Sequence, residues 1–246
     1  MKRTNDQVYW SIALIVLSTC FYGLAYVIFH DAGSVLRDLI TNLAFLPIYV
    51  LLVTLVVERM LASRDKRARL KKMYMAIGVF FNETGTPLIG KLGAFNLQAS
   101  ELEAELSAIG RWSDREMVAT RKRLGQRRFD LDTQAGDLEA LKVFLLGQRD
   151  SLLRLLENSN LLEHETFTDL LWAVFHLADE LAHRRQASAL SEPDRAHISS
   201  DMQRAYGLLL SEWVAYMQHL RSDYPYLFSL AVRLNPFDPN ASPEIV

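Results

Sequence analysis

The chain has 246 residues, a formal net charge of −2 and a single cysteine, and half of its residues are hydrophobic. The nearly balanced charge gives no electrostatic reason to expect nucleic acid or an acidic ligand as a partner. The lone Cys20 excludes a disulfide within the chain.

Two apolar runs near the N-terminus predict two transmembrane helices. Residues 8–29 and residues 39–57 contain no charged side chain. At 1.5 Å per helical residue, each run is about long enough to cross a hydrocarbon core of about 30 Å. The first run is longer than the apolar core of a signal peptide, and no small-residue cleavage site follows it. We therefore expect an uncleaved two-helix anchor.

The charges that flank these runs predict an orientation. Lys2 and Arg3 precede the first span, whereas the connecting loop, residues 30–38, holds Arg37 against Asp31 and Asp38. The positive-inside rule then places both termini in the cytoplasm and the loop outside, in a multi-pass membrane protein. The basic residues after the second span are Arg59, Arg64, Lys66, Arg67, Arg69, Lys71 and Lys72.

Four residues within the spans are candidates for helix packing. Thr19 and Gly23 are small residues four apart, which would allow a close approach between helices of one hairpin or of two chains. Asn42 either hydrogen-bonds across helices or lies at the outer interface, and Pro47 is expected to kink the second span. Neither span contains an acidic, basic or histidine side chain, which argues against a pump or a voltage sensor.

Residues 58–72 are half basic, and we expect the second span to continue into them as a helix. Basic side chains beside a membrane attract anionic headgroups by about 1 kcal/mol each, although the same charges would also fix the topology. The apolar residues 73–81 either lie in the membrane interface or pack under the soluble domain. The candidates for headgroup binding are Arg64, Lys66, Arg67, Arg69, Lys71 and Lys72.

Residues 82–96 contain Gly85, Pro87, Gly90 and Gly93 without a clear period, which predicts a hinge. The predicted organisation is therefore a transmembrane hairpin at 1–60 and a basic juxtamembrane helix with a hinge at 61–99. A cytoplasmic helical domain follows at 100–234, and a proline-rich, flexible tail occupies 235–246.

The pattern from residue 100 onwards is all-α and predicts an antiparallel helical bundle. Ser100 with Glu103, and Ser113 with Glu116, match the capping box of a helix start. Residues 224–234 are apolar nearly all round, so they must be buried or touch lipid. Three apolar stripes at helical spacing comprise Leu138, Leu141, Leu145, Leu152 and Leu156; Phe167, Leu171, Val174, Ala178 and Leu181; and Ile198, Met202, Ala205, Leu209, Trp213, Tyr216 and Leu220.

The search for chemistry yields no catalytic residue, cofactor or metal. Glu180-x-x-His183 and Asp194-x-x-His197 have the spacing found on helices of di-iron bundles, but such a site needs further carboxylates facing them. Two arginines follow His183 in what resembles a last helical turn, so we expect a solvated helix end there and His176 as a boundary residue. A basic run at 120–128 lacks the interleaved aromatic residues and the recognised module of a nucleic-acid site.

Three segments, NLAFLPIYVLLVTLVVERML (42–61), NSNLLEHETFTDLLWAVFHLADEL (158–181) and SDYPYLFSLAVRLNPFDP (222–239), carry a resemblance. They resemble a group of uncharacterised prokaryotic membrane proteins with two spans and a helical cytoplasmic domain, which implies the same architecture and no known activity. We expect a non-enzymatic inner-membrane protein whose cytoplasmic domain scaffolds or relays signals through contacts with its own copies or with another membrane or cytoplasmic protein. A homo-oligomeric channel lined by the second span is the alternative.

Overall fold

The computed structural model describes residues 2–29 and 32–244, and its contacts divide the chain into two compact units, Met1–Lys66 and Arg67–Val246. The described residues confirm the all-α class: they contain no β-strand beyond an isolated bridge between Asn96 and Leu131. The helices are α1 (Lys2–Phe29), α2 (Ala32–Phe80), η1 (Phe81–Gly85, a π-helix), α3 (Thr86–Gly93), α4 (Ala99–Leu106), η2 (Ser107–Arg111), α5 (Asp114–Gln126), α6 (Leu138–Leu156), α7 (Ser159–Leu162), α8 (Glu165–Ala182), η3 (Ala187–Ala189), α9 (Glu192–Asp223) and α10 (Pro225–Arg233).

Within the first unit, α1 and the first part of α2 cover the two predicted spans. Because α2 begins at Ala32, most of the predicted loop at 30–38 is helical, and only residues 30–31 fall outside the described residues. By length and composition, the segment Leu36–Gly93 includes a stretch apolar enough to cross a membrane, and Ile15–Ile28 is a shorter apolar helix. The predicted helical continuation into residues 58–72 is confirmed, since α2 runs through Pro47 and the basic stretch to Phe80.

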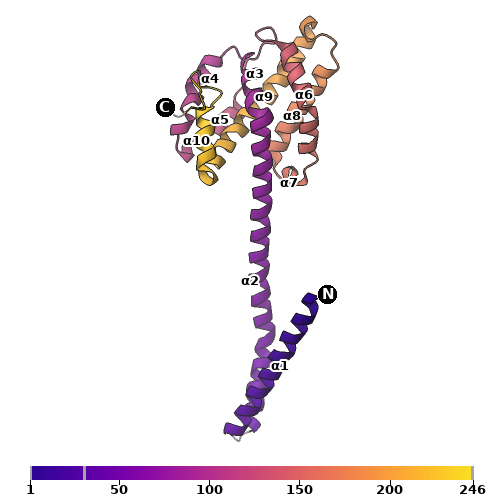
Figure 1. Ribbon diagram of the computed structural model, residues 1–246, viewed down its shortest axis with the longest axis vertical. Coiled ribbons are helices and arrows are strands. Elements are labelled where there is room, and N and C mark those ends of the chain that lie inside the picture. Colours follow the sequence, from indigo (N-terminus) through magenta and orange to yellow (C-terminus); the bar gives the residue numbers. More distant parts are fainter. Residues whose placement is uncertain (1, 30–31, 245–246) are drawn as a thin grey trace. The chain divides into compact units, whose positions relative to one another are not determined.

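The second unit is built around α9. Helices α5 and α8 pack along α9, α6 packs on α8, and α3 and α10 also contact α9 (Figure 1). Among the described residues, two ion pairs join α5 to α9: Arg121 Nη2 lies 2.8 Å from Oε1 of the buried Glu212, and Arg221 Nη1 lies 3.9 Å from Asp114 Oδ1. The remaining contacts between these helices are mostly apolar, as the stripes in the sequence predict.

The three apolar stripes are confirmed almost residue by residue. The 138–156 stripe forms α6 with the predicted bounds, and the other two lie on α8 and α9. Leu156 is only partly buried, at the end of α6. The buried members are Leu138, Leu141, Leu145, Leu152, Phe167, Leu171, Val174, Ala178, Leu181, Ile198, Met202, Ala205, Leu209, Trp213, Tyr216 and Leu220.

The hinge predicted at 82–96 is wrong, because η1 and α3 are helical and partly buried. Pro87 lies in the first turn of α3, where its missing N–H costs no hydrogen bond. Gly85 is required by close packing: a Cβ there would lie 2.6 Å from the ring of Phe81. The second unit accordingly begins at Arg67, so residues 67–99 belong to the helical domain.

The predicted flexible tail is also wrong at its start. Asn235 and Phe237 are buried, and the Asn235 side chain donates a 3.0 Å hydrogen bond to the carbonyl of Leu106. The ring of Phe237 packs edge-on against Trp213, with the ring centroids 5.3 Å apart. Residues 235–237 therefore belong to the domain core.

One of the two predicted capping boxes is present. Ser113 Oγ accepts a hydrogen bond from the Glu116 backbone N–H, and Glu116 accepts one from the Ser113 backbone N–H, at the start of α5. The box predicted at Ser100 is wrong, since α4 begins one residue earlier, after Gln98, without a side-chain cap.

The structure resolves one of the two open alternatives within the second unit, and the contact of 224–234 with lipid stays a prediction. Residues 73–81 pack into the domain, where Met73, Ile77 and Phe80 are buried. Helix α10, at 225–233, has a packed side and an exposed side. The packed side comprises Phe228, Ala231 and Val232, and the exposed large apolar residues are Tyr226, Leu227, Leu230 and Leu234, the last just beyond the helix end.

Candidate functional site

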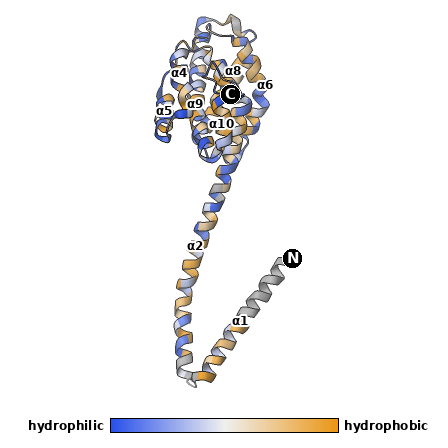
Figure 2. Ribbon diagram, turned by 60° about the vertical axis from the view of Figure 1, so that its left-hand side comes forward, coloured by the Kyte–Doolittle hydropathy of each residue, from blue (hydrophilic) through white to orange (hydrophobic). Residues whose placement is uncertain are grey.

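The six candidates for headgroup binding all lie on α2, where the helix changes from hydrophobic to hydrophilic (Figure 2). Arg69 has its Nη1 3.6 Å from Glu163 Oε1, but its side chain is 57% exposed. An exposed pair of this kind contributes little, so the guanidinium remains accessible. Arg64, Lys66, Lys71 and Lys72 are also exposed, whereas the side chain of Arg67 is not among the described residues.

The span-packing candidates differ in the contacts that they make. Asn42 donates a 3.1 Å hydrogen bond to the hydroxyl of Tyr22, which links α2 to α1. Thr19 donates to the carbonyl of Ile15 within its own helix, and a Cβ at Gly23 would meet nothing within 4 Å. The close helix approach at Thr19 and Gly23 therefore stays a prediction.

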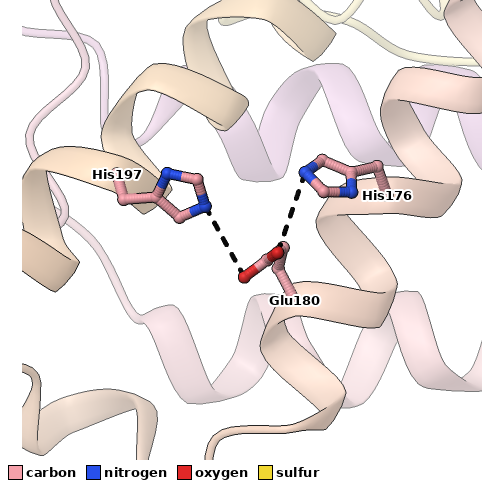
Figure 3. A group of neighbouring side chains, drawn as sticks. All are labelled: His176, Glu180 and His197. Carbon is pink, nitrogen blue, oxygen red and sulfur yellow. Dashed lines mark ion pairs between the residues drawn. The ribbon is translucent and has the colours of Figure 1, made fainter.

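A different constellation lies between α8 and α9. His176 and Glu180 are one turn apart on α8, and His197 and Asp201 are one turn apart on α9. Because α8 packs against α9, the four side chains meet. Figure 3 shows the imidazoles of His176 and His197 on either side of the Glu180 carboxylate.

The four potential ligand atoms are closely spaced. His176 Nε2 lies 3.8 Å from Glu180 Oε1 and 3.3 Å from Asp201 Oδ2. His197 Nε2 lies 3.6 Å from Glu180 Oε2 and 3.4 Å from Asp201 Oδ2. Each imidazole nitrogen thus faces a carboxylate of its own helix and one of the other helix.

Asp201 is the buried member of this cluster. It is 3% exposed, and its Oδ2 atom accepts no hydrogen bond although both imidazole nitrogens are nearby. Its other oxygen, Oδ1, lies 3.7 Å from Arg204 Nη1, whose side chain is largely exposed. Leaving a buried carboxylate oxygen without a partner costs free energy, so this oxygen calls for an explanation.

Arg184 fixes the orientation of Glu180. Its Nη1 donates a 2.6 Å hydrogen bond to Glu180 Oε2, and its Nη2 donates one of 2.5 Å to Asp194 Oδ1. The hydrogen bond from Arg184 lowers the pKa of the Glu180 carboxyl and that of the Asp194 carboxyl. Glu180 is therefore an anion at neutral pH and is held in one position.

Each pair with a spacing of three, Glu180 with His183 and Asp194 with His197, contributes only one member to this cluster. His183 caps the end of α8, with its Nδ1 2.8 Å from the carbonyl of Asp179, in keeping with the expected helix end. Asp194 pairs with Arg184 and lies outside the group of facing atoms. The informative signal was the spacing of four, His176-x-x-x-Glu180 and His197-x-x-x-Asp201, which places both members of a pair on one helical face.

Two family models match nearly the whole chain. One, described as "MJ1433, N-terminal helical domain", matches residues 2–61, and the other, "Uncharacterized protein MJ1433, C-terminal helical domain", matches residues 69–233. The "Uncharacterized protein MJ1433" of the archaeon Methanocaldococcus jannaschii is 40% identical over 237 residues, which is 95% of each chain. No solved structure matches. The chain therefore belongs to the MJ1433 family.

Proposed function

We propose that this member of the MJ1433 family is a non-enzymatic integral protein of the prokaryotic inner membrane. In this proposal, α1 and α2 cross the bilayer as a hairpin with both termini in the cytoplasm. The second unit is then a cytoplasmic antiparallel helical bundle that scaffolds or relays signals through contacts with its own copies or with other proteins.

The observation that carries the anchor is the uncovered apolar surface of α2. Leu43, Tyr49 and Leu51 are each more than 60% exposed, and the apolar window of this helix has none of its residues buried. A soluble protein rarely exposes an apolar surface of this extent, whereas a bilayer covers it without cost. The exposed basic side chains that follow on α2 fit the cytoplasmic headgroup layer.

Two further features favour a scaffold over a pore. Asn42, a polar residue of the second span that could line a channel, already donates a hydrogen bond to Tyr22 of the same chain. The exposed apolar side of α10, centred on Leu227 and Leu230, offers the second unit a surface for protein contacts.

Cysteine labelling in intact cells tests the topology. In a Cys20→Ser background, Asp38→Cys should react with a membrane-impermeant maleimide from outside, and Asp150→Cys only after permeabilisation. Carbonate extraction should leave the protein in the membrane fraction. Labelling of Asp150→Cys in intact cells, or release by carbonate, would contradict the proposal.

Replacing Arg64, Lys66 and Arg69 together by glutamine tests the headgroup contacts. In nanodiscs of anionic lipid, amide exchange in residues 58–72 should be slower than in zwitterionic nanodiscs for the natural chain, and equal in both for the variant. The matched control, in which Arg64 and Arg69 are replaced by lysine and Lys66 is unchanged, should behave like the natural chain because it retains the charge. Equal exchange of the natural chain in both lipids would remove the headgroup role.

A further inference from the structure

We propose that His176, Glu180, His197 and Asp201 form a binding site for one divalent transition-metal ion, for which Zn²⁺ is the best-fitting cation. The site lies wholly within the second unit, between α8 and α9, so it does not depend on the membrane anchor.

The nitrogen-to-oxygen distances in the cluster are close to those between ligand atoms of a tetrahedral site. Two ligand atoms that each lie 2.0–2.1 Å from a tetrahedral Zn²⁺ are about 3.3 Å apart. The Nε2 atoms of His176 and His197 lie 3.3 and 3.4 Å from Asp201 Oδ2, and they lie 3.8 and 3.6 Å from Oε1 and Oε2 of Glu180, respectively. To bind one ion together with both imidazoles, the Glu180 carboxylate would need to move only slightly closer to the two Nε2 atoms.

The buried oxygen of Asp201 provides an independent reason to place an ion there. Its Oδ2 lies within 3.4 Å of two imidazole nitrogens and accepts a hydrogen bond from neither. In an ordinary ion pair, the imidazole N–H would be aligned with this oxygen and donate to it. A cation bound by all three atoms satisfies the carboxylate and uses the imidazole lone pairs instead.

The charges and donor types favour zinc over the alkaline-earth cations. Arg184 pairs with both Asp194 and Glu180 Oε2, so the Glu180 carboxylate is shared between this guanidinium and the ion, and together with Asp201 it offsets the charge of the ion. Two imidazoles with two carboxylates suit Zn²⁺, whereas Mg²⁺ and Ca²⁺ prefer sites made of oxygen. The imidazoles of His176 and His197 are 46% and 51% exposed, so an ion can enter from solvent.

Metal titration of the full chain in detergent micelles, after treatment with EDTA, tests this site. Co²⁺ serves as the optical probe, because tetrahedral coordination gives intense visible absorption, and Zn²⁺ should displace it. We expect saturation at one ion per chain with a dissociation constant below about 1 µM, and no displacement by millimolar Mg²⁺. X-ray absorption at the zinc edge should show nitrogen and oxygen neighbours only.

Three ligand variants and one matched control decide the assignment. His176→Gln, His197→Gln and Asp201→Asn should each weaken binding at least about tenfold. His183→Gln, which removes a neighbouring histidine outside the cluster, should bind as the natural chain does. Circular dichroism separates loss of binding from loss of fold, and the exposed positions of His176 and His197 make unfolding of those two variants unexpected.

The proposal is overturned if the natural chain shows no saturable binding, or if the ligand variants that stay folded bind as tightly as the natural chain. An equal loss in His183→Gln would overturn it too, because ordinary surface histidines would then account for the signal.

Discussion

Asp201→Asn should affect stability in opposite ways with and without zinc. The substitution keeps the shape of the side chain and removes the charge of a group that is 3% exposed. In metal-free protein, the ion-pair contacts that are lost are those with the exposed guanidinium of Arg204, 3.7 Å away, and with the half-exposed imidazoles of His176 and His197; each pair with an exposed group of this kind contributes less than about 1 kcal/mol. Removing a buried charge whose Oδ2 accepts no hydrogen bond compensates for these losses. The unfolding free energy should therefore stay the same or rise.

Zinc should reverse the order of stability of the natural chain and the Asp201→Asn variant. At a free Zn²⁺ concentration of 100 times the dissociation constant, binding stabilises the natural chain by about 2.7 kcal/mol. A variant that binds a hundredfold more weakly gains only about 0.4 kcal/mol under the same conditions. For a domain of this size, 1 kcal/mol shifts the melting temperature by about 2–4 °C, so zinc should raise that of the natural chain by about 5–11 °C and that of the variant by about 1–2 °C.

Differential scanning calorimetry of the full chain, with EDTA and with buffered Zn²⁺, measures both effects. His183→Gln serves as the control and should show the full zinc shift. An equal zinc shift in the natural chain and in Asp201→Asn would refute the argument, as would a loss of several kcal/mol in the metal-free variant, because the carboxylate would then have a strong partner within the protein.

Three other expectations follow from the second unit. Phe167→Ala should lower the unfolding free energy by about 3–5 kcal/mol in urea titrations, because Phe167 is fully buried and packs edge-on against Phe80; a loss below 1 kcal/mol would contradict this packing. Ser113→Ala should cost about 1 kcal/mol and Ser113→Asp much less, since only alanine removes the acceptor for the Glu116 N–H. Burial lowers the pKa of His219 from its ordinary 6.5, although Asp223 opposes this shift. The unfolded chain therefore binds the proton more readily than the folded chain, so the unfolding free energy should fall as the pH drops below about 6.5. His219→Gln should flatten this part of the profile of stability against pH.

The helices of the second unit were predictable because their determinants are local. Leu138 to Leu156 and Phe167 to Leu181 repeat every three or four residues, and this repeat alone defines a buried face. The three glycines and the one proline of 82–96 misled the prediction, because their effect depends on position. Pro87 begins a helix and Gly85 makes room for a ring, and both facts require the neighbouring elements.

The cluster of His176, Glu180, His197 and Asp201 was harder to predict because it depends on the contact between two helices. Each His-to-carboxylate pair is local, but the 20 residues between His176 and His197 contain a helix end, a loop and a new helix start. The rotation of α8 against α9 decides whether the two pairs face each other. The sequence also offered competing pairs at a spacing of three, which the structure assigns to a helix cap and to the partners of Arg184.

Helix α9 connects the proposed metal site to the end of α2, so it is the element through which the proposed relay would act. It carries His197 and Asp201 near its start, and further along it Tyr216 stacks on Phe81 and His219 stacks on Tyr74 of α2. An ion that joins α8 to α9 therefore restrains the same helix against which the end of α2 packs. If the anionic headgroup contacts of α2 and the metal site bias one common state, each must change the affinity of the other by the same factor.

This reciprocity can be measured as the Zn²⁺ affinity of the full chain in anionic and in zwitterionic nanodiscs. Anionic lipid also concentrates Zn²⁺ near its surface, so the glutamine variant of Arg64, Lys66 and Arg69 is the necessary control. A ratio of affinities that is larger for the natural chain than for this variant, by about fivefold or more, would demonstrate the coupling. Equal ratios would mean that the metal site stabilises the α8–α9 contact locally, because an ion without differential affinity for two states cannot shift the population between them.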